Sequence, residues 1–301
     1  MTATSGSERD RRSKTPALVV SGFLGSGKTS LVLHLLESAL EEGIRVAVVS
    51  NELGELGIDR ALLGRGGDAF VELEGGCVCC ELSDDLLDTL QTLREQVDPD
   101  RIVIETSGVA LPFDTTLNFW REPISAWVGE DTAVVVVNAE QLAERRDLEG
   151  TFEDQVSSAD LLVLNKVDLV PEGSLEALEA LLRELEPEAP IVRCTRGRVP
   201  VDLLFPPDPQ TVDRTRPPPP AREHGHEQFA TREWQVPEDI TPDELVQQLR
   251  RPGLLRAKGW AMTTEGVKLV QVVGRRVELS ADEPADDAPV GRIVLIERAG
   301  S

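Results

Sequence analysis

The stretch GFLGSGKT (22–29) decides the predicted fold, because it matches the phosphate-binding pattern G-x-x-x-x-G-K-[ST]. An apolar run (17–22) precedes it and an amphipathic segment (30–43) follows it, so we expect a strand, a loop and a helix in that order. Glycines let backbone N–H groups surround phosphates without a Cβ in the way, and the helix N-terminus adds positive potential. The predicted phosphate-binding residues are Gly22, Gly25, Ser26, Gly27, Lys28, Thr29 and Ser30.

Three side chains have predicted roles in phosphate chemistry. We expect Lys28 to reach the β- and γ-phosphates and the Thr29 hydroxyl to bind Mg²⁺. Glu105 ends the apolar run RIVIE (101–105), and an acid at the carboxyl end of a parallel strand can face Mg²⁺ or the attacking water. Taken alone, Glu105 has a second interpretation as a capping acid at the end of a strand.

The sequence NKVD (165–168) predicts which base is bound. It directly follows the apolar run 161–164, and the Asp168 carboxylate can accept hydrogen bonds from N1 and N2 of guanine, which adenine cannot donate. Asn165 and Lys166 would shape the loop and cover the base, whereas Cys194 on the next strand is interpreted as a small packing residue. With the phosphate loop, this pattern predicts a Mg²⁺-dependent enzyme that hydrolyses guanine nucleotides.

Outward from the phosphate loop, short apolar runs alternate with helical segments. Near-continuous apolar strands separated by helices are typical of a parallel sheet covered on both faces. We therefore predict an α/β fold, a three-layer P-loop NTPase with a mostly parallel sheet. The predicted strands are 17–22, 44–51, 69–73, 101–105, 132–137, 161–164 and 190–193, and helices are expected at 30–43 and from Ser83 onward.

Composition divides the 301 residues into four parts. The predicted parts are a flexible tail (1–15), a nucleotide domain (16–205), a Pro-rich linker (206–223) and a smaller α+β domain (224–301). In the last part we expect a strand at 228–236, a helix at 241–251 that begins with a capping box of Thr241 and Glu244, a strand meander at 260–280 and a strand at 291–297.

The segment GGCVCCELSDD (75–85) predicts a thiol metal site. Cys77, Cys79 and Cys80 lie within four residues beside an expected helix start, which favours the thiolate form that binds Zn²⁺ or Cu⁺. Three sulfurs leave a tetrahedral site incomplete, so water or another side chain must complete it. The candidates are Glu72, Glu74, Glu81 and Glu52. A redox pair and inert buried cysteines stay open as alternatives.

Two further histidines have two interpretations. His224 and His226 form the tripeptide HGH at the start of the smaller domain, where they would either capture metal weakly or belong to a solvated linker. His34 lies within the expected helix after the phosphate loop and is interpreted as structural.

Charge and composition exclude several classes of partner. The net charge is −23, with 54 acidic against 31 basic residues, which disfavours binding to nucleic acid or to an anionic membrane surface. Four cysteines do not make a disulfide framework, and no apolar run approaches the roughly 20 residues of a membrane span. Since the N-terminus has no apolar stretch typical of a secretory signal, we expect a cytoplasmic protein.

Five motifs in this order, GFLGSGKT, SNELGELGID, ELEGGCVCC, IVIETSG and LNKVDL, resemble the CobW family of P-loop GTPases over residues 16 to about 275. Members are metallochaperones related to the nickel-inserting accessory GTPases of hydrogenase and urease. The resemblance implies GTP-dependent delivery of a metal, often zinc and in some members cobalt, to a client protein. It also implies a Walker-B-like role for Glu105, guanine recognition by Asn165 and Asp168, and metal binding by the CxCC cysteines.

The resemblance adds a candidate switch and shows some departures. Asn51, Glu52 and Asp59 match the family stretch NExGExxxD, which we expect to sense the γ-phosphate and couple nucleotide state to metal binding. The chain has Asn138 where the family has Asp, and Gly75 where Asn often stands. The His-rich loop of the family is reduced to two histidines.

These observations predict a GTPase metallochaperone for zinc that serves a metal-requiring client. The alternatives are a GTPase that inserts cobalt or another metal, a small-molecule kinase, and a thiol redox or zinc sensor that binds nucleotide. No water-positioning Gln or Arg finger is evident in the sequence, so we expect a low intrinsic rate. The missing group would come from a partner protein or from a second copy in a homo-oligomer.

Overall fold

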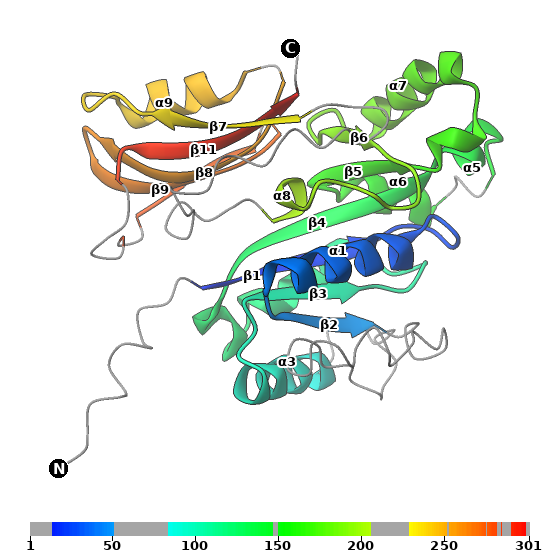
Figure 1. Cartoon of the computed structure of the whole chain (residues 1–301), viewed down its shortest axis with the longest axis horizontal. Coiled ribbons are helices and arrows are strands. Elements are labelled where there is room, and N and C mark those ends of the chain that lie inside the picture. The colour runs from blue at the N-terminus through cyan, green and yellow to red at the C-terminus, as the bar shows by residue number, and fades with distance from the viewer. Residues whose placement is uncertain are drawn as a thin grey trace.

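The computed structural model contains two β-sheets with their helices (Figure 1). It describes residues 14–50, 84–146, 150–205, 229–251, 253–274, 276–281, 284 and 290–298. The predicted strand 69–73 and the Pro-rich linker lie outside these ranges. None of the helices within them is both long and apolar enough to cross a membrane.

Six strands of the described residues form a parallel sheet with the order β2-β3-β1-β4-β5-β6. Their bounds are β1 (Thr15–Ser21), β2 (Val46–Ser50), β3 (Arg101–Glu105), β4 (Val128–Asn138), β5 (Leu161–Asn165) and β6 (Ile191–Arg193). The pairing places Glu105 beside Val20 and beside Ser50, and Asn138 beside Asn165. The functional strand ends therefore meet at one edge of the sheet, and the predicted parallel α/β fold is confirmed.

Alternate residues of these strands enter cores on opposite faces of the sheet. In β1, Leu18 and Val20 pack with α1 (Lys28–Glu42), whereas Ala17 and Val19 pack with α3 (Asp84–Gln96). A third core contains the side chains of β4 and β5 that point away from the α1 face of the sheet, and further helices cover it. Those are α5 (Ala139–Ala143), α6 (Thr151–Ser157) and α7 (Leu175–Leu185). Both faces are thus covered, which explains the nearly continuous apolar strands.

Short elements connect the strands and helices. They are α4 (Pro112–Thr116), η2 (Leu117–Trp120), η3 (Ile124–Ala126), η4 (Val167–Leu169), η5 (Glu172–Ser174) and α8 (Val201–Leu204). Strand β4 begins at Val128, four residues before the predicted start, because its first residues, which include charged ones, still pair with β1. Apolar periodicity alone does not detect such residues.

The second sheet is antiparallel, with the order β10-β9-β8-β11-β7. Its strands are β7 (Phe229–Gln235), β8 (Leu254–Thr263), β9 (Gly266–Val273), β10 (Arg276–Ser280) and β11 (Arg292–Arg298). Helix α9 (Pro242–Leu249) packs on one face and begins with the predicted capping box of Thr241 and Glu244. The meander begins at Leu254 rather than at residue 260, because β8 is buried on both faces near its start and lacks alternation.

The two sheets share a packed junction. Leu255 of β8 and Ile296 of β11 belong to the same core as α1. Arg256 follows Leu255 in β8 and pairs with Ile296 of β11. This fully buried residue donates hydrogen bonds to Thr132 Oγ1 (3.2 Å) and to the Leu204 carbonyl (2.9 Å). The guanidinium thus joins β8 to β4 and to the end of α8, whose last carbonyls have no partner within the helix.

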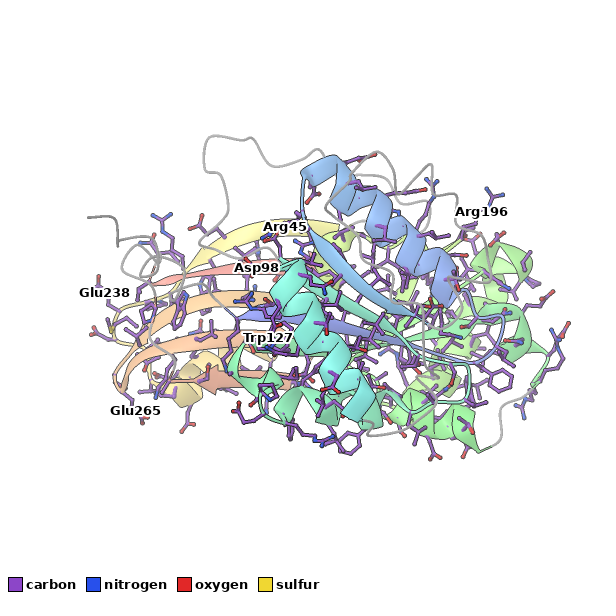
Figure 2. All side chains as sticks on the ribbon, turned by 90° about the horizontal axis from the view of Figure 1, so that it is seen from below. Arg45, Asp98, Trp127, Arg196, Glu238 and Glu265 are labelled. Atoms are coloured by element: carbon purple, nitrogen blue, oxygen red, sulfur yellow. The ribbon has the colours of Figure 1, made fainter. Side chains whose placement is uncertain are left out.

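The junction lies away from the edge where the functional strand ends meet. Figure 2 shows Arg196, which follows β6, at one end of the molecule and Glu238 and Glu265 of the second unit at the opposite end. The carboxyl ends of the parallel strands likewise face away from the second sheet in Figure 1.

Candidate nucleotide site

The phosphate loop between β1 and α1 has no room for side chains at two glycines. A Cβ at Gly22 (φ +135°) would lie 2.2 Å from the Val136 carbonyl oxygen. A Cβ at Gly27 (φ +102°) would lie 2.2 Å from Asn165 Nδ2. These positive φ angles and close approaches require glycine. The pattern of the sequence therefore has a direct steric cause, and the loop wraps around the N-terminus of α1.

Two polar groups lie inside this loop. The Lys28 ammonium donates hydrogen bonds to the carbonyls of Gly22 (2.9 Å) and Phe23 (3.5 Å), and its side chain is buried. Ser26 Oγ is also buried and has no hydrogen-bond partner among the described residues. A cation and an unpartnered hydroxyl donor in a glycine-lined loop fit the oxygens of a phosphate.

Three oxygen-bearing side chains meet at the carboxyl ends of β2 and β3. Thr29 Oγ1 donates to Glu105 Oε1 (2.8 Å), and Ser50 Oγ donates to Glu105 Oε2 (2.9 Å). Glu105 is almost fully buried. Hydroxyl and carboxylate oxygens are the ligands that Mg²⁺ prefers, so Thr29 and Glu105 fit this ion. Ser50 was not predicted from the sequence. Its place at the end of a predicted strand was visible there, but its contact with Glu105 depends on the pairing of β2 with β3.

Asn165 connects the phosphate loop to the loop after β6. Its Nδ2 donates to the Ser26 carbonyl (2.8 Å), while Oδ1 accepts from the Gly197 amide (3.0 Å) and from Cys194 Sγ (3.3 Å). Through these contacts the buried Asn165 side chain fixes the phosphate loop against the loop after β6. The predicted packing role of Cys194 agrees with its burial in the core.

Of the other NKVD residues, Val167 is buried in a core, Lys166 is half-buried and Asp168 is exposed. Lys166 has a left-handed backbone (φ +61°), which turns the chain out of β5. Asp168 follows in η4 with an exposed side chain. An exposed carboxylate on an ordered turn can accept hydrogen bonds from a base, as predicted for guanine.

Asn138 and Gln141 contact the phosphate loop from β4 and α5. Asn138 Oδ1 caps α5 by accepting from the amides of Glu140 and Gln141, and its Nδ2 donates to the Gly25 carbonyl (3.5 Å). Gln141 Nε2 donates to the Leu24 carbonyl (3.3 Å). An aspartate at position 138 could form the cap but could not donate to Gly25. Asn138, which departs from the family pattern, therefore adds a hydrogen bond to the phosphate loop.

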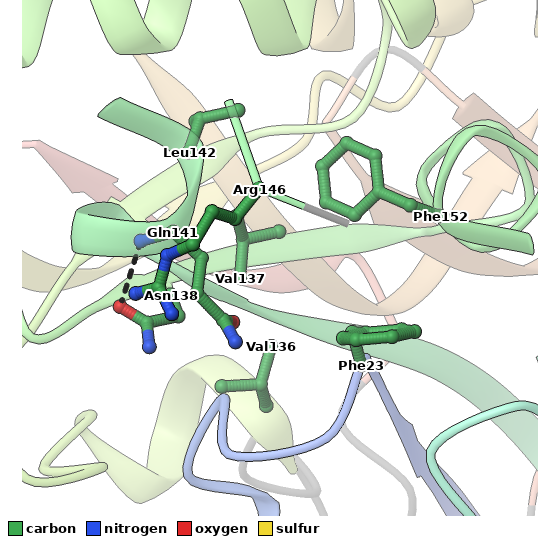
Figure 3. Close-up of a pocket in the computed structure, with 8 residues that line it drawn as sticks. All are labelled: Phe23, Val136, Val137, Asn138, Gln141, Leu142, Arg146 and Phe152. Carbon is green, nitrogen blue, oxygen red and sulfur yellow. Dashed lines mark hydrogen bonds between the residues drawn. The ribbon is translucent and has the colours of Figure 1, made fainter. Parts of the chain in front are cut away.

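These two amides border a small pocket beside the loop (Figure 3). Figure 3 shows the two amides on one side and the rings of Phe23 and Phe152 on the other. The lining residues are Phe23, Val136, Val137, Asn138, Gln141, Leu142, Arg146 and Phe152.

Gln155 holds the turn that follows β3. Its Nε2 donates to the carbonyls of Gly108 (3.1 Å) and Ala110 (2.9 Å), and the residue is 0% exposed. Ser21 Oγ donates to the same Ala110 carbonyl (3.2 Å). Gln155 was not predicted from the sequence, because a lone glutamine in a helical segment indicates nothing about its contacts.

Several predicted residues lie outside the described ranges. These are the candidate metal ligands Cys77, Cys79 and Cys80, the switch candidates Asn51, Glu52 and Asp59, and the two histidines His224 and His226. Within the part of the chain that is described, no group of three or more His, Cys, Asp or Glu side chains is arranged to hold a metal ion.

Two family models match the chain. The model of the CobW/HypB/UreG nucleotide-binding domain matches residues 16–193. The model of the cobalamin synthesis protein CobW C-terminal domain matches residues 229–300. The two matches coincide with the parallel and the antiparallel sheet.

Individual relatives carry zinc-related names. A zinc chaperone CobW from Pseudomonas aeruginosa is 32% identical and covers 94% of this chain and 87% of the relative. A zinc chaperone CobW from Sinorhizobium sp is 34% identical and covers 65% of this chain; the aligned region spans 64% of that relative, just under two thirds. The crystal structure of the Zn(II)-bound YjiA GTPase from E. coli is similar with a TM-score of 0.50 at 26% identity, covering 96% of this chain and 95% of that one.

Proposed function

This chain belongs to the CobW/HypB/UreG family, and on that premise we propose that it hydrolyses GTP and delivers zinc to a client protein in the cytoplasm. One observation carries the nucleotide half of the proposal. The phosphate loop, the acid that ends β3 and the NKVD loop are joined by the Thr29–Glu105 and Asn165–Ser26 hydrogen bonds at one edge of the sheet. Such an arrangement can bind the phosphates and the base of one nucleotide together.

Each group has a specific task in the proposed reaction. Lys28 moves from the loop carbonyls to the phosphate oxygens, and Asp168 accepts hydrogen bonds from guanine. Thr29 and Glu105 hold Mg²⁺, which when bound neutralises charge on the β- and γ-phosphates. Water attacks the γ-phosphorus while the bond to the β-phosphate oxygen breaks, so GDP and inorganic phosphate are the products.

The metal half of the proposal rests on the CxCC cysteines and on the names of the relatives. Zinc is the cargo, and Cys77, Cys79 and Cys80 are its proposed ligands. Ser50 supports a coupling to nucleotide state, because it binds Glu105 and directly precedes Asn51, the first residue of the proposed switch. A nucleotide that rearranges the Glu105 contacts would therefore act on the chain leading to the cysteines.

Nucleotide specificity tests the first half. We expect the wild-type protein to bind GTP far more tightly than ATP in titration calorimetry, and Asp168→Asn to weaken GTP binding by about 1–3 kcal/mol through the unpaired N1 and N2 donors. Glu172→Gln, an exposed acid change a few residues downstream, is the matched control and should bind GTP normally. GTP affinity that is unchanged in Asp168→Asn would refute the assignment of the base site.

Metal competition tests the second half. The protein is titrated with zinc against a chromophoric chelator, once with GDP and once with a non-hydrolysable GTP analogue. We expect near-stoichiometric zinc binding, lost when the three cysteines become serines, and a different zinc affinity in the two nucleotide states, since coupling between two sites is reciprocal. Equal zinc affinities with both nucleotides would remove the switch, and absence of zinc binding would remove the metal site.

A further inference from the structure

We infer that Gln155 is a positioning residue for GTP hydrolysis, because it fixes the turn Ser107–Ala110 against the phosphate loop. The inference rests on the proposed function and adds a residue that lies in none of the nucleotide-binding motifs. Gln155 belongs to α6, which lies on the interior side of the turn. Its side-chain amide donates hydrogen bonds to the backbone of the turn.

The turn lies where the nucleotide chemistry is proposed. It begins two residues after Glu105 and is closed by a hydrogen bond from the Ala110 amide to the Ser107 carbonyl (3.2 Å). A Cβ on Gly108 would lie 2.8 Å from the Leu24 side chain and 3.0 Å from the Leu24 nitrogen. The backbone of the turn therefore rests directly on the phosphate loop, so a shift in one displaces the other.

Gln155 holds two carbonyls of this one turn. Both N–H groups of its amide are used, one on Gly108 and one on Ala110. Because the two anchored carbonyls are two residues apart, they restrict the rotation of the Gly108–Val109–Ala110 backbone between them. Because α6 is itself fixed by Phe152 and Val156 in the core, the anchor is rigid. The carbonyls are held from the protein interior, and the opposite side of the turn is left toward the surface, where Val109 is 63% exposed.

Packing alone does not account for a glutamine at this position. The Oε1 atom of Gln155 is buried and has no hydrogen-bond partner within the described ranges. A buried amide oxygen without a partner lowers stability, whereas methionine would fill a similar volume without that cost. What glutamine offers and methionine lacks is a pair of N–H donors, and both are directed at carbonyls of the turn.

The test compares Gln155→Met with a matched change, Gln91→Met. Gln91 on α3 also has a buried Oε1 lacking a partner in the described structure, and its Nε2 donates to Glu95 of the same helix. Steady-state GTP hydrolysis gives kcat and KM, and fluorescence titration gives the Kd for GDP. We expect Gln155→Met to lower kcat about 10-fold or more, because a turn that is no longer held in place misplaces the groups around the phosphates. The Kd for GDP should stay within about 2-fold of the wild-type value. Gln91→Met should change none of these constants.

A second variant gives a pH readout that a purely structural role would not produce. In Gln155→Glu, an ionised carboxylate facing two carbonyls cannot donate, but protonation restores one donor. We therefore expect kcat of this variant, relative to that of Gln155→Met, to rise as the pH is lowered from 8 to 6. A kcat ratio that does not change with pH would contradict the donor role.

The outcomes separate this inference from the proposed function. Normal wild-type turnover with unchanged turnover in Gln155→Met overturns the inference alone. A loss of kcat that is matched by an equal loss of GDP affinity and of folded protein also overturns it, because it would reflect damage to the fold. A wild-type protein that does not hydrolyse GTP overturns the proposed function and this inference together.

Discussion

Asp131 near the start of β4 carries a charge that the fold disfavours. It lies at the junction of the two sheets, and burial and the nearby Asp160 carboxylate raise its pKa from 3.8 to about 6, against an opposing effect of Arg276 of β10. Arg276 itself forms an ion pair with Asp160. Arg276 also forms an ion pair with Glu278 (3.3 Å), whose carboxylate adds to the rise in the pKa of Asp131. One cation therefore faces three carboxylates, and we predict that Asp131→Asn stabilises the protein at neutral pH.

The sign and size of this effect follow from the pKa shift. A carboxyl group whose pKa is higher in the folded state binds its proton more tightly there, so ionisation of Asp131 destabilises the fold as pH rises from about 4 to 7. The shift, at 1.36 kcal/mol per unit, corresponds to at most about 3 kcal/mol at pH 7.5 and to about half of that at pH 5. Solvent screening of a partly buried carboxylate reduces both values in proportion.

Urea denaturation of wild type and Asp131→Asn at pH 5.0 and pH 7.5 measures this difference. We expect the variant to be more stable at both pH values, with about twice the gain at pH 7.5. Asp88→Asn, an exposed change on α3, is the control and should show no such dependence on pH. A stability difference between Asp131→Asn and wild type that is equal at the two pH values would refute the argument that Asp131 is desolvated.

Two other perturbations probe the second sheet. Arg256→Met removes the hydrogen bonds to Thr132 and to the Leu204 carbonyl, and we expect about 2–4 kcal/mol of destabilisation and separate urea transitions of the two units, followed by circular dichroism and tryptophan fluorescence. A single transition at the wild-type midpoint would contradict this role. Thr241→Ala removes the side-chain cap of α9 and should lower the free energy of unfolding by about 1 kcal/mol, whereas Thr241→Ser should restore it.

The sequence predicted the residues whose chemistry depends on local order along the chain. The glycines of the phosphate loop, Lys28 and Thr29 are adjacent in the sequence, so their pattern and the flanking strand and helix were sufficient to predict the fold. Ser50 and Gln155 were not predicted, because each acts on a segment about 50 residues away. Contacts over such separations depend on which strands become neighbours, and β2 pairs with β3 across a long intervening segment.

Residue patterns in the sequence were sufficient for the nucleotide-binding architecture and for the family resemblance, because a few adjacent residue types specify each of them. The metal ligands of the CxCC motif stay a prediction. Tertiary structure alone decided how the parts are held together. Asn165 became a link between two loops, Asn138 gained a contact with the phosphate loop, and Arg256 became the buried connection between the sheets. The physical reason is that a side-chain amide or guanidinium can serve any nearby carbonyl, and only the folded chain selects which carbonyl is near.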